Sequence, residues 1–377
     1  MGKAKKWVFI AMAAVVASAL LASIIGAGCA PGAPAPAAPS PSPAAPAPKV
    51  IKWRMPTTWP TGMFFYPEGA KAICDRVAEM SGGRFIIEPY PAGAIMGALE
   101  VFDAVSKGAV ECAHTWPGYW RGKERSFELF TSIPNQMVQQ EWVIWLYGPP
   151  RGIDLWRELY AKYNAIPFPG GLIGPEFGFF TRKPVHSLED FKGMKLRVSG
   201  LCADVMKELG ASTMLVAGGE IYTAMERGVI DGFEYSTPAV DWPMGFQEIA
   251  PYVVLPCWHQ PSACLETVVN LDAWNKLPDD LKAIFESACK EVALIDHMAH
   301  LEGANAEYLK KFEEYGTKIT VLSPEDMKKI SEITNRLADE QAAKDPFYAK
   351  VLKSQRDFLK EYRTWEKWGN YQLYAVE

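Results

Sequence analysis

The feature that most constrains the fold is an alternation of short apolar strands and amphipathic helices, which occurs twice along the chain. The predicted strands span 50–54, 84–90, 110–116, 178–181, 194–198, 213–216 and 230–234. The predicted helices span 70–80, 97–107, 204–209 and 220–227. Strand–helix–strand units at this spacing predict parallel, doubly wound sheets. We therefore expect an α/β protein with two doubly wound domains around a ligand cleft, in the manner of periplasmic binding proteins.

One long helix is predicted over 278–315, where an apolar stripe begins at Pro278 and ends before Gly316. Such a helix would be about 57 Å long, which exceeds one domain of this size. It either breaks near Gly303 or runs along both domains as a brace. The predicted divisions are domain I (49–173 and about 265–300), domain II (174–264 and about 301–345) and a C-terminal helix (346–377).

The N-terminus has the pattern of a secretory signal. Lys3, Lys5 and Lys6 precede the uncharged apolar run 7–25, and small residues lead into Cys29. This favours cleavage and lipid attachment at Cys29, as in bacterial lipoproteins. A cleaved secretory signal and a retained membrane helix remain alternatives, and all three place the body of the chain outside the cytoplasm.

A tether follows the signal. Residues 31–48 are almost entirely Pro and Ala, so the segment from 30 to 48 has nothing to bury and is typical of extended polyproline-like chain. It could hold a folded domain about 55 Å from a membrane anchor. A disordered end without a role is the alternative.

Charge and motifs exclude several classes of function. A formal net charge of −5 argues against a nucleic-acid-binding surface. No GxSxG, HExxH, P-loop or dinucleotide-binding pattern occurs, so we expect no enzyme and no organic cofactor. His297 and His300 lack a nearby third metal ligand, and Cys257 and His259 are too close in sequence to form a thiol–imidazole pair readily.

Six cysteines follow Cys29, namely Cys74, Cys112, Cys202, Cys257, Cys264 and Cys289. In an exported protein they permit disulfides, but the sequence does not fix the pairing. Cys74 and Cys289 lie on apolar helix faces and are predicted to be small buried hydrophobes.

Several segments occur in the same order as in one family. They are 90–93 (YPAG), 104–109 (AVSKGA), 112–115 (CAHT), 191–200 (FKGMKLRVSG), 219–225 (GEIYTAM), 227–234 (RGVIDGFE) and 269–274 (VNLDAW). They resemble the extracytoplasmic solute-binding proteins of TRAP transporters, DctP type, and most closely their 2-oxo-acid-binding branch. The resemblance extends over roughly residues 50–370.

The resemblance implies a carboxylate-binding role for Arg197, at the end of a strand facing the cleft. A guanidinium presents parallel donors to a carboxylate, whereas an ion pair with a protein acid is the structural alternative. Glu176, Tyr119 and Glu234 complete the predicted substrate-binding set.

The resemblance also implies a cation between protein and ligand, held by Glu176, Glu234, the carbonyl of Tyr235, and Gln260. This chain has Glu176 where the family has Gln, Gln260 where it has Glu, and Tyr235 where it has Trp. Because the first two changes cancel in charge and keep oxygen ligands, Na⁺ or Ca²⁺ remains the expected ion. Loss of the metal, with Glu176 meeting a ligand hydroxyl, is the alternative.

The predicted function is the substrate-binding subunit of a TRAP-type secondary transporter, which captures a small 2-oxo or 2-hydroxy monocarboxylate by domain closure. Its expected partners are the transporter's membrane subunits, with a homodimer through the C-terminal helix as an option. An ABC-type binding protein, an exported hydrolase or lyase using Glu176 or Glu234 as base, and a partner of a membrane sensor kinase are the rivals.

Overall fold

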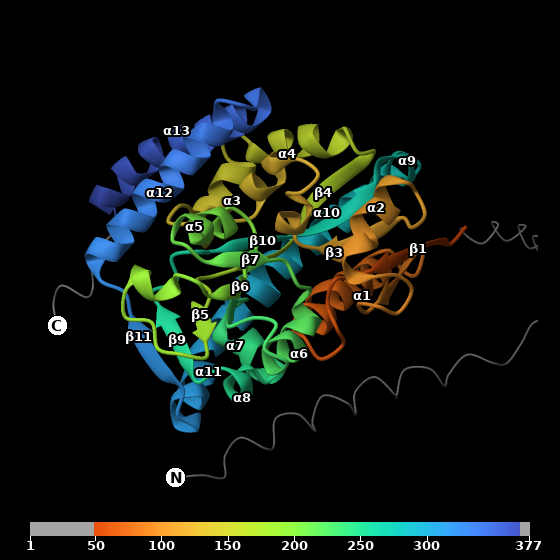
Figure 1. Cartoon of the computed structure of the whole chain (residues 1–377). Coiled ribbons are helices and arrows are strands. Elements are labelled where there is room, and N and C mark those ends of the chain that lie inside the picture. The colour runs from red at the N-terminus through yellow and green to blue at the C-terminus, as the bar shows by residue number, and fades with distance from the viewer. Residues whose placement is uncertain (1–48, 370–377) are drawn as a thin grey trace, which may run out of the picture. The chain divides into compact units, whose positions relative to one another are not determined.

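The computed structural model describes residues 49–369 (Figure 1). Its strands are β1 (Ile51–Pro56), β2 (Phe85–Tyr90), β3 (Cys112–Thr115), β4 (Ala165–Ile173), β5 (Phe179–Thr181), β6 (Lys195–Arg197), β7 (Ser212–Met214), β8 (Gly232–Glu234), β9 (Tyr252–Leu255), β10 (Ala263–Asn270) and β11 (Lys318–Val321). Every strand predicted from the sequence is present, within a few residues of its expected bounds.

The α-helices are α1 (Ala72–Met80), α2 (Val101–Ser106), α3 (Gln139–Tyr147), α4 (Gly152–Ala161), α5 (Cys202–Glu208), α6 (Ile221–Glu226), α7 (Pro238–Asp241), α8 (Phe246–Ile249), α9 (Leu271–Asn275), α10 (Asp279–Glu291), α11 (Glu302–Tyr315), α12 (Pro324–Ala342) and α13 (Pro346–Gly369). Two π-helical stretches are η1 (Tyr66–Lys71) and η8 (Val292–Leu301). Short 3₁₀ turns are η2 (Ala98–Glu100), η3 (Pro117–Trp120), η4 (Arg125–Phe130), η5 (Leu188–Phe191), η6 (Gly218–Glu220) and η7 (Trp242–Met244).

The first lobe is built on β1, β2, β3, β10 and β4. Strands β1 and β2 pair in parallel, while β10 lies antiparallel between β3 and β4. A single parallel bridge between Thr57 and His114 links β1 to β3. The aromatic core of this lobe includes Phe127, Phe130 and Trp156.

The second lobe is built on a six-stranded sheet in the order β11-β9-β5-β8-β6-β7. Strand β5 runs antiparallel to both of its neighbours, and the other pairs are parallel. The α/β class with two lobes is therefore confirmed, but the expectation of purely parallel sheets is wrong in both lobes.

The antiparallel strands β4 and β10 are the physical reason for that error. They pair along their whole length, with one register shift between Leu265 and Glu266. The β4 sequence contains Pro167, Pro169, Gly170 and Gly171, which are residues that rarely mark a strand. The two strands carry the chain between the lobes and so cannot belong to a repeating strand–helix unit.

The long helix is continuous. α10, η8 and α11 follow one another from Asp279 to Tyr315 without a break at Gly303. α10 packs against α1 and β4 of the first lobe, and α11 packs against α7 of the second. Of the two alternatives, the brace along both lobes is the one observed.

The C-terminal helix α13 lies against α3, α4 and η4 of the first lobe and against α12. Its apolar face buries Tyr348, Val351 and Leu352. Within residues 49–369, no helix combines the length and apolar character needed to cross a bilayer. The predicted signal, Cys29 and the tether lie outside the described residues.

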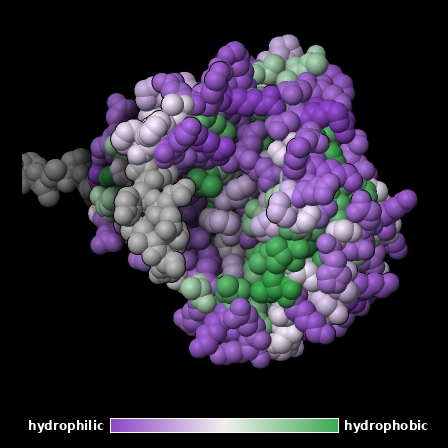
Figure 2. Space-filling view, turned by 90° about the vertical axis from the view of Figure 1, so that its left-hand side faces the viewer, coloured by the Kyte–Doolittle hydropathy of each residue, from purple (hydrophilic) through white to green (hydrophobic). Residues whose placement is uncertain are grey.

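The face shown in Figure 2 is largely hydrophilic, and its largest hydrophobic patch lies toward the lower part of the view. All six cysteines from Cys74 onward are free thiols, and five of them are buried. Burial therefore confirms the prediction of small buried hydrophobes for Cys74 and Cys289, and none of the six forms a disulfide.

Candidate functional site

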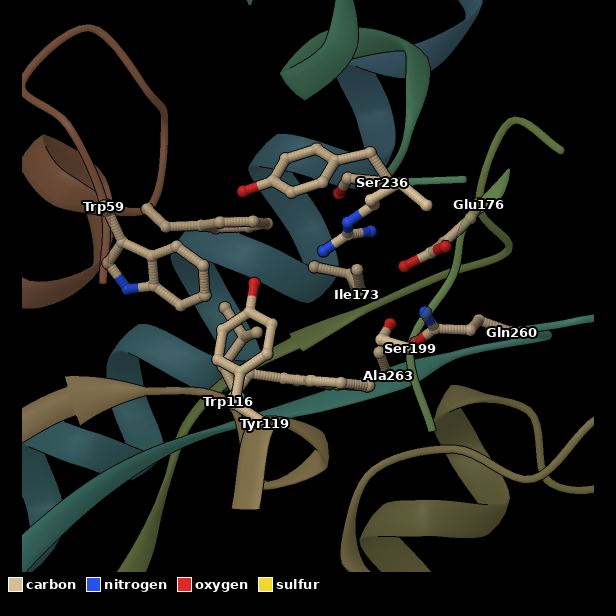
Figure 3. A pocket seen from close by; sticks show the side chains of 13 residues that line it. Trp59, Trp116, Tyr119, Ile173, Glu176, Ser199, Ser236, Gln260 and Ala263 are labelled. Carbon is tan, nitrogen blue, oxygen red and sulfur yellow. The ribbon is translucent and has the colours of Figure 1, made fainter. Parts of the chain in front are cut away.

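A small pocket, whose empty space of about 300 Å³ includes open solvent, lies between the two lobes. Its lining residues are Trp59, Phe65, Trp116, Tyr119, Ile173, Glu176, Arg197, Ser199, Tyr235, Ser236, Gln260, Ala263 and Leu265. Glu176 and Gln260 lie at one end of the pocket, and Trp59 lies at the other (Figure 3). The pocket therefore has a charged end and an aromatic end.

Neighbouring parallel strands bring two charges to this pocket. Arg197 ends β6 and lies opposite Phe233 of β8, and Glu234 follows as the last residue of β8. Because parallel strands end at the same edge of a sheet, the two side chains meet there. The site thus forms beyond the carboxyl ends of the strands, as the α/β pattern predicts.

Arg197 is almost fully buried and is held by the protein itself. Its Nη1 donates to the Glu234 carbonyl at 2.6 Å and to Glu234 Oε1 at 3.0 Å, and its Nε donates to the Val216 carbonyl at 3.1 Å. Of the two roles weighed from the sequence, the ion pair with a protein acid is present, and Arg197 also lines the pocket, where binding of a ligand carboxylate stays a prediction. The terminal nitrogen Nη2 is the part of the fork that these bonds leave for a ligand.

Glu234 accepts hydrogen bonds on both of its carboxylate oxygens. Besides Arg197, its Oε1 accepts from the Ser199 backbone N–H at 2.8 Å and from the Ser199 hydroxyl at 2.9 Å, and its Oε2 accepts from Gln260 Nε2 at 3.3 Å. Burial raises the pKa of Glu234, while Arg197 and Ser199 oppose that shift. Ser199 is a site residue that the sequence reading missed.

Glu176 reaches the pocket through a segment that needs glycine. Gly178 has φ +89°, and a Cβ placed there would lie 2.1 Å from the Val254 carbonyl oxygen, so only glycine allows this close turn beside β9. The Glu176 N–H donates to the Gln260 carbonyl at 3.3 Å. This contact ties together the two segments that carry Glu176 and Gln260, the positions at which the resemblance implies an exchange of residues.

His259 contacts the Glu176 carboxylate. Its Nε2 lies 2.9 Å from Glu176 Oε2, and both side chains are buried. Burial, together with the charge of Arg197, lowers the pKa of His259 to about 3. The imidazole is therefore neutral, and its hydrogen bond with the Glu176 carboxyl orients that side chain whichever of the two groups holds the shared proton.

The negative charge of the Glu176 carboxylate is poorly compensated by its surroundings. Burial raises its pKa well above the ordinary value, and the nearby carboxylates of Glu234 and Asp241 raise it further. Asp241 is also fully buried. Several acidic groups thus share one low-dielectric region with a single guanidinium, an arrangement that an added cation would stabilise.

The donor set fits a hard cation. One ligand atom from each of Glu176, Glu234 and His259 lies within 4.8 Å of the others. The buried Gln260 Oε1 and Ser236 Oγ have no hydrogen-bond partner. Carboxylate and amide oxygens with unfilled acceptor capacity are ligands that Na⁺ and Ca²⁺ prefer.

Tyr235 and Tyr119 also lie at the pocket, as predicted. The Tyr235 ring packs under the Arg197 guanidinium at 5.2 Å, and its hydroxyl approaches Met63 Sδ at 3.0 Å. Burial raises the pKa of Tyr119 to about 12, so its hydroxyl is a neutral hydrogen-bonding group beside Arg197.

The aromatic end was not predicted from the sequence. Trp59 donates its indole N–H to His114 Nδ1 at 2.7 Å, and His114 Nε2 lies 2.9 Å from the Gly170 carbonyl. Phe65 contacts Trp59 edge-on and stacks on His297. His297 is therefore a buried core histidine that supports the pocket wall.

Comparison with known proteins identifies the family. A model of the bacterial extracellular solute-binding proteins, family 7 (DctP), matches residues 60–345. This chain belongs to the DctP family. Its members are solute receptors of TRAP transporters, which confirms the predicted class and argues against the enzyme and ABC-type alternatives.

Two of the relatives are described with a 2-oxo acid. A monocarboxylate 2-oxoacid-binding periplasmic protein of Nostoc sp. is 36% identical over 317 residues, which cover 84% of this chain and 86% of that protein. A TRAP periplasmic solute-binding protein of Pseudoalteromonas atlantica with bound sodium and pyruvate has a TM-score of 0.82 and 34% identity, over 87% of this chain and 99% of that one.

A second solved relative, from Bordetella bronchiseptica, contains copurified calcium and picolinate. It has a TM-score of 0.82 and 30% identity, and the match covers 85% of this chain and 95% of the relative. These DctP proteins therefore share the two-lobed fold of the present chain, and both relatives contain a cation with a carboxylate.

Proposed function

We propose that this DctP protein captures a small 2-oxo or 2-hydroxy monocarboxylate, together with a Na⁺ or Ca²⁺ ion, for the membrane subunits of a TRAP transporter. The observation that carries the proposal is the convergence of Arg197, Glu176, Glu234 and His259 on one end of a small interlobe pocket. The ligands named for the relatives support the same class.

Each site residue has a role in this proposal. Arg197 Nη2 binds the ligand carboxylate, and the Tyr119 hydroxyl adds a neutral hydrogen bond. Glu176, Glu234, the Tyr235 carbonyl and Gln260 would hold the cation, whose positive charge would offset theirs and polarise the 2-oxo group of the ligand.

Charge and size both favour a short monoanion. With Glu176 and Glu234 both ionised, Arg197 and Ca²⁺ leave one positive charge for a ligand monoanion. With Na⁺ the monoanion is balanced when one of the two carboxyls stays protonated, which the raised pKa of the buried Glu176 favours. The remaining wall is made by Trp59, Phe65 and Trp116, which suits a short apolar substituent rather than a second carboxylate.

Domain closure is the proposed mechanism. Arg197 and Glu234 come from the second lobe, while Trp59 and Tyr119 come from the first. A ligand that contacts both sets has a higher affinity for the closed state, and this difference drives closure. The domain limits given from the sequence remain part of this proposal.

Calorimetry with pyruvate tests the ligand and the cation together. We expect binding in buffer containing Ca²⁺ or Na⁺, and a weaker affinity after chelation of Ca²⁺ or replacement of Na⁺ by a bulkier ion. Mass spectrometry of the ligand carried through purification would identify it independently. Affinity that is indifferent to both cation treatments would contradict the cation, and consumption of pyruvate by pure protein would favour the hydrolase or lyase alternative.

Anchoring and assembly are finer parts of the proposal. We propose lipid attachment at Cys29, with 30–48 as the tether. A homodimer through α13 is supported by the exposure of Trp365 and Trp368 at 67% and 81%, since large exposed aromatics are typical of interfaces. Light scattering that gives a concentration-independent monomer mass would contradict the dimer.

A further inference from the structure

Charged side chains join the two lobes beside the pocket. Asp204 lies on α5 of the second lobe, and its Oδ2 accepts from Arg121 Nη2 at 2.5 Å and from Arg125 Nη2 at 2.7 Å. Arg121 directly follows the η3 turn of the first lobe, and Arg125 is the first residue of its η4 turn. One carboxylate of the second lobe is thus held by two guanidinium groups of the first.

Glu128 fixes the arginines within the first lobe. It is fully buried, and it accepts from Arg121 Nε at 2.7 Å and from Arg125 Nη2 at 2.9 Å. The Tyr348 hydroxyl of α13 also contacts it, at 3.2 Å. Because two guanidinium groups share one internal acid, this lobe presents one uncompensated positive charge, which Asp204 balances.

The contact lies close in sequence to the pocket on both sides. Tyr119 precedes Arg121 by two residues, and Ser199 precedes Asp204 by five. The lobes also touch near these residues, because the Trp116 ring of the first lobe lies 3.6 Å from where a Cβ of Gly200 in the second lobe would be. Closure around a ligand and contact between Asp204 and the arginines therefore occur in the same movement.

Asp204 is suited to a charged contact. Burial opposes its ionisation, but Arg121 and Arg125 outweigh that effect and lower its pKa. It remains about one-fifth exposed, at 19% of its side chain, and Lys207 of its own helix approaches it at 3.4 Å. A partly shielded network with several charges is worth more than an isolated surface pair.

We propose that Asp204, Arg121 and Arg125 form an ionic latch between the lobes that retains the captured ligand. None of the three lines the pocket, so they act on the open–closed equilibrium and not on ligand contacts. The proposal rests on the ligand-driven closure proposed above. A contact made only in the closed state lowers the rate of ligand release more than it changes the rate of capture.

The test compares Asp204→Asn with Glu208→Gln. Both substitutions remove one negative charge from α5, but Glu208 pairs with Arg336 of α12 and not with the first lobe. With pyruvate as the probe in Ca²⁺-containing buffer, stopped-flow measurement should show release about tenfold faster for Asp204→Asn, with capture nearly unchanged. Glu208→Gln should release at the wild-type rate.

A second measurement does not depend on the ligand being correct. Spin labels at the exposed positions Lys107→Cys and Arg227→Cys report the distance between the lobes. Without ligand, Asp204→Asn should shift the distance distribution toward the open form relative to Glu208→Gln. Identical distributions and release rates for the two variants would overturn the latch. Failure of wild-type protein to bind pyruvate would instead overturn the proposed ligand, and the distances would still decide the latch.

Discussion

The buried carboxyl group in the core of the first lobe and those in the pocket differ in how their negative charge is compensated. In the core of the first lobe, Glu266 accepts a hydrogen bond from the Trp120 indole at 2.8 Å and another from the Tyr160 hydroxyl. Both donors are neutral, and burial raises the pKa of Glu266 to about 8. In the pocket, by contrast, Glu234 pairs with a guanidinium and Glu176 has only an imidazole.

The difference separates a structural acid from a binding site. When it is protonated on Oε2, Glu266 donates to the Tyr160 hydroxyl while its Oε1 accepts from the Trp120 indole, so it needs no charged partner. The pocket acids coexist with an arginine and with unpartnered acceptors such as Gln260 Oε1, so their arrangement is completed by a charged ligand and a cation. Substitutions in the two sets should therefore change different properties.

The largest expected effect is on ligand binding, through Arg197→Ala. Loss of the charged hydrogen bond in a closed pocket should weaken pyruvate binding by about 2–5 kcal/mol. Arg197→Lys should be nearly as damaging, because an ammonium cannot bond Glu234 and a ligand with the same geometry. Calorimetry checks both.

The matched control is Arg227→Ala, which removes an exposed arginine from the same lobe. It should bind pyruvate as the wild type does. Circular dichroism should show the fold intact in all three variants. An alanine variant at Arg197 whose affinity stays within threefold of wild type would show that this residue does not bind the carboxylate.

The ionisation of Glu266 should make the free energy of unfolding depend on pH. The unfolded chain releases the proton above about pH 4.5, whereas the folded protein keeps it until about pH 8. Between these values the folded state binds more protons, so stability falls as pH rises, by about 1.4 kcal/mol per pH unit. Glu266→Gln removes this loss, since the amide cannot ionise.

Urea unfolding at pH 5 and pH 7.5 measures this difference, and the glutamine variant should have the flatter profile. Tyr160→Phe provides a comparison. It removes one donor from Glu266 and should cost about 1 kcal/mol of stability, with no change in pyruvate affinity. If wild type and Glu266→Gln lost stability in parallel over this range, Glu266 would not be the group responsible.

The smallest expected effect is a coupling between Glu176 and Gln260. Glu176→Gln removes a carboxylate from the proposed cation site, and Gln260→Glu adds one beside Glu234, so each should weaken ligand binding. The double variant restores the charge and should recover much of the loss, with a coupling of about 0.5–3 kcal/mol. Strictly additive affinities in calorimetry would mean that the two residues share no cation.

Local sequence predicted most elements of the fold but not the link between the lobes. The strands that end at Arg197 and Glu234 lie where the local apolar pattern predicts them, within a residue. β4 was missed because its Pro and Gly residues are tolerated only through pairing with β10. That pairing joins segments about a hundred residues apart and leaves no local pattern.

The residues named from the sequence lie together in the structure, while their binding roles stay predictions and their network of contacts was not predicted. The structure brings together Arg197, Glu176, Glu234, Tyr235 and Gln260, all named from the resemblance, along with Tyr119. It also adds His259, which the sequence analysis considers only as a partner of Cys257 in a thiol–imidazole pair. The segment containing Trp258 and Gln260 was already implicated, so the intervening histidine was the available signal.

The uninterrupted helix from Asp279 to Tyr315 has a consequence for the entropy of capture. Its centre is the π-helical stretch Val292–Leu301, a wider turn of the kind that accommodates local bending. Two lobes attached to one such helix can bend about that stretch but cannot slide or rotate freely. Closure therefore removes few degrees of freedom, and little of the favourable contact energy of the ligand is lost to ordering the protein.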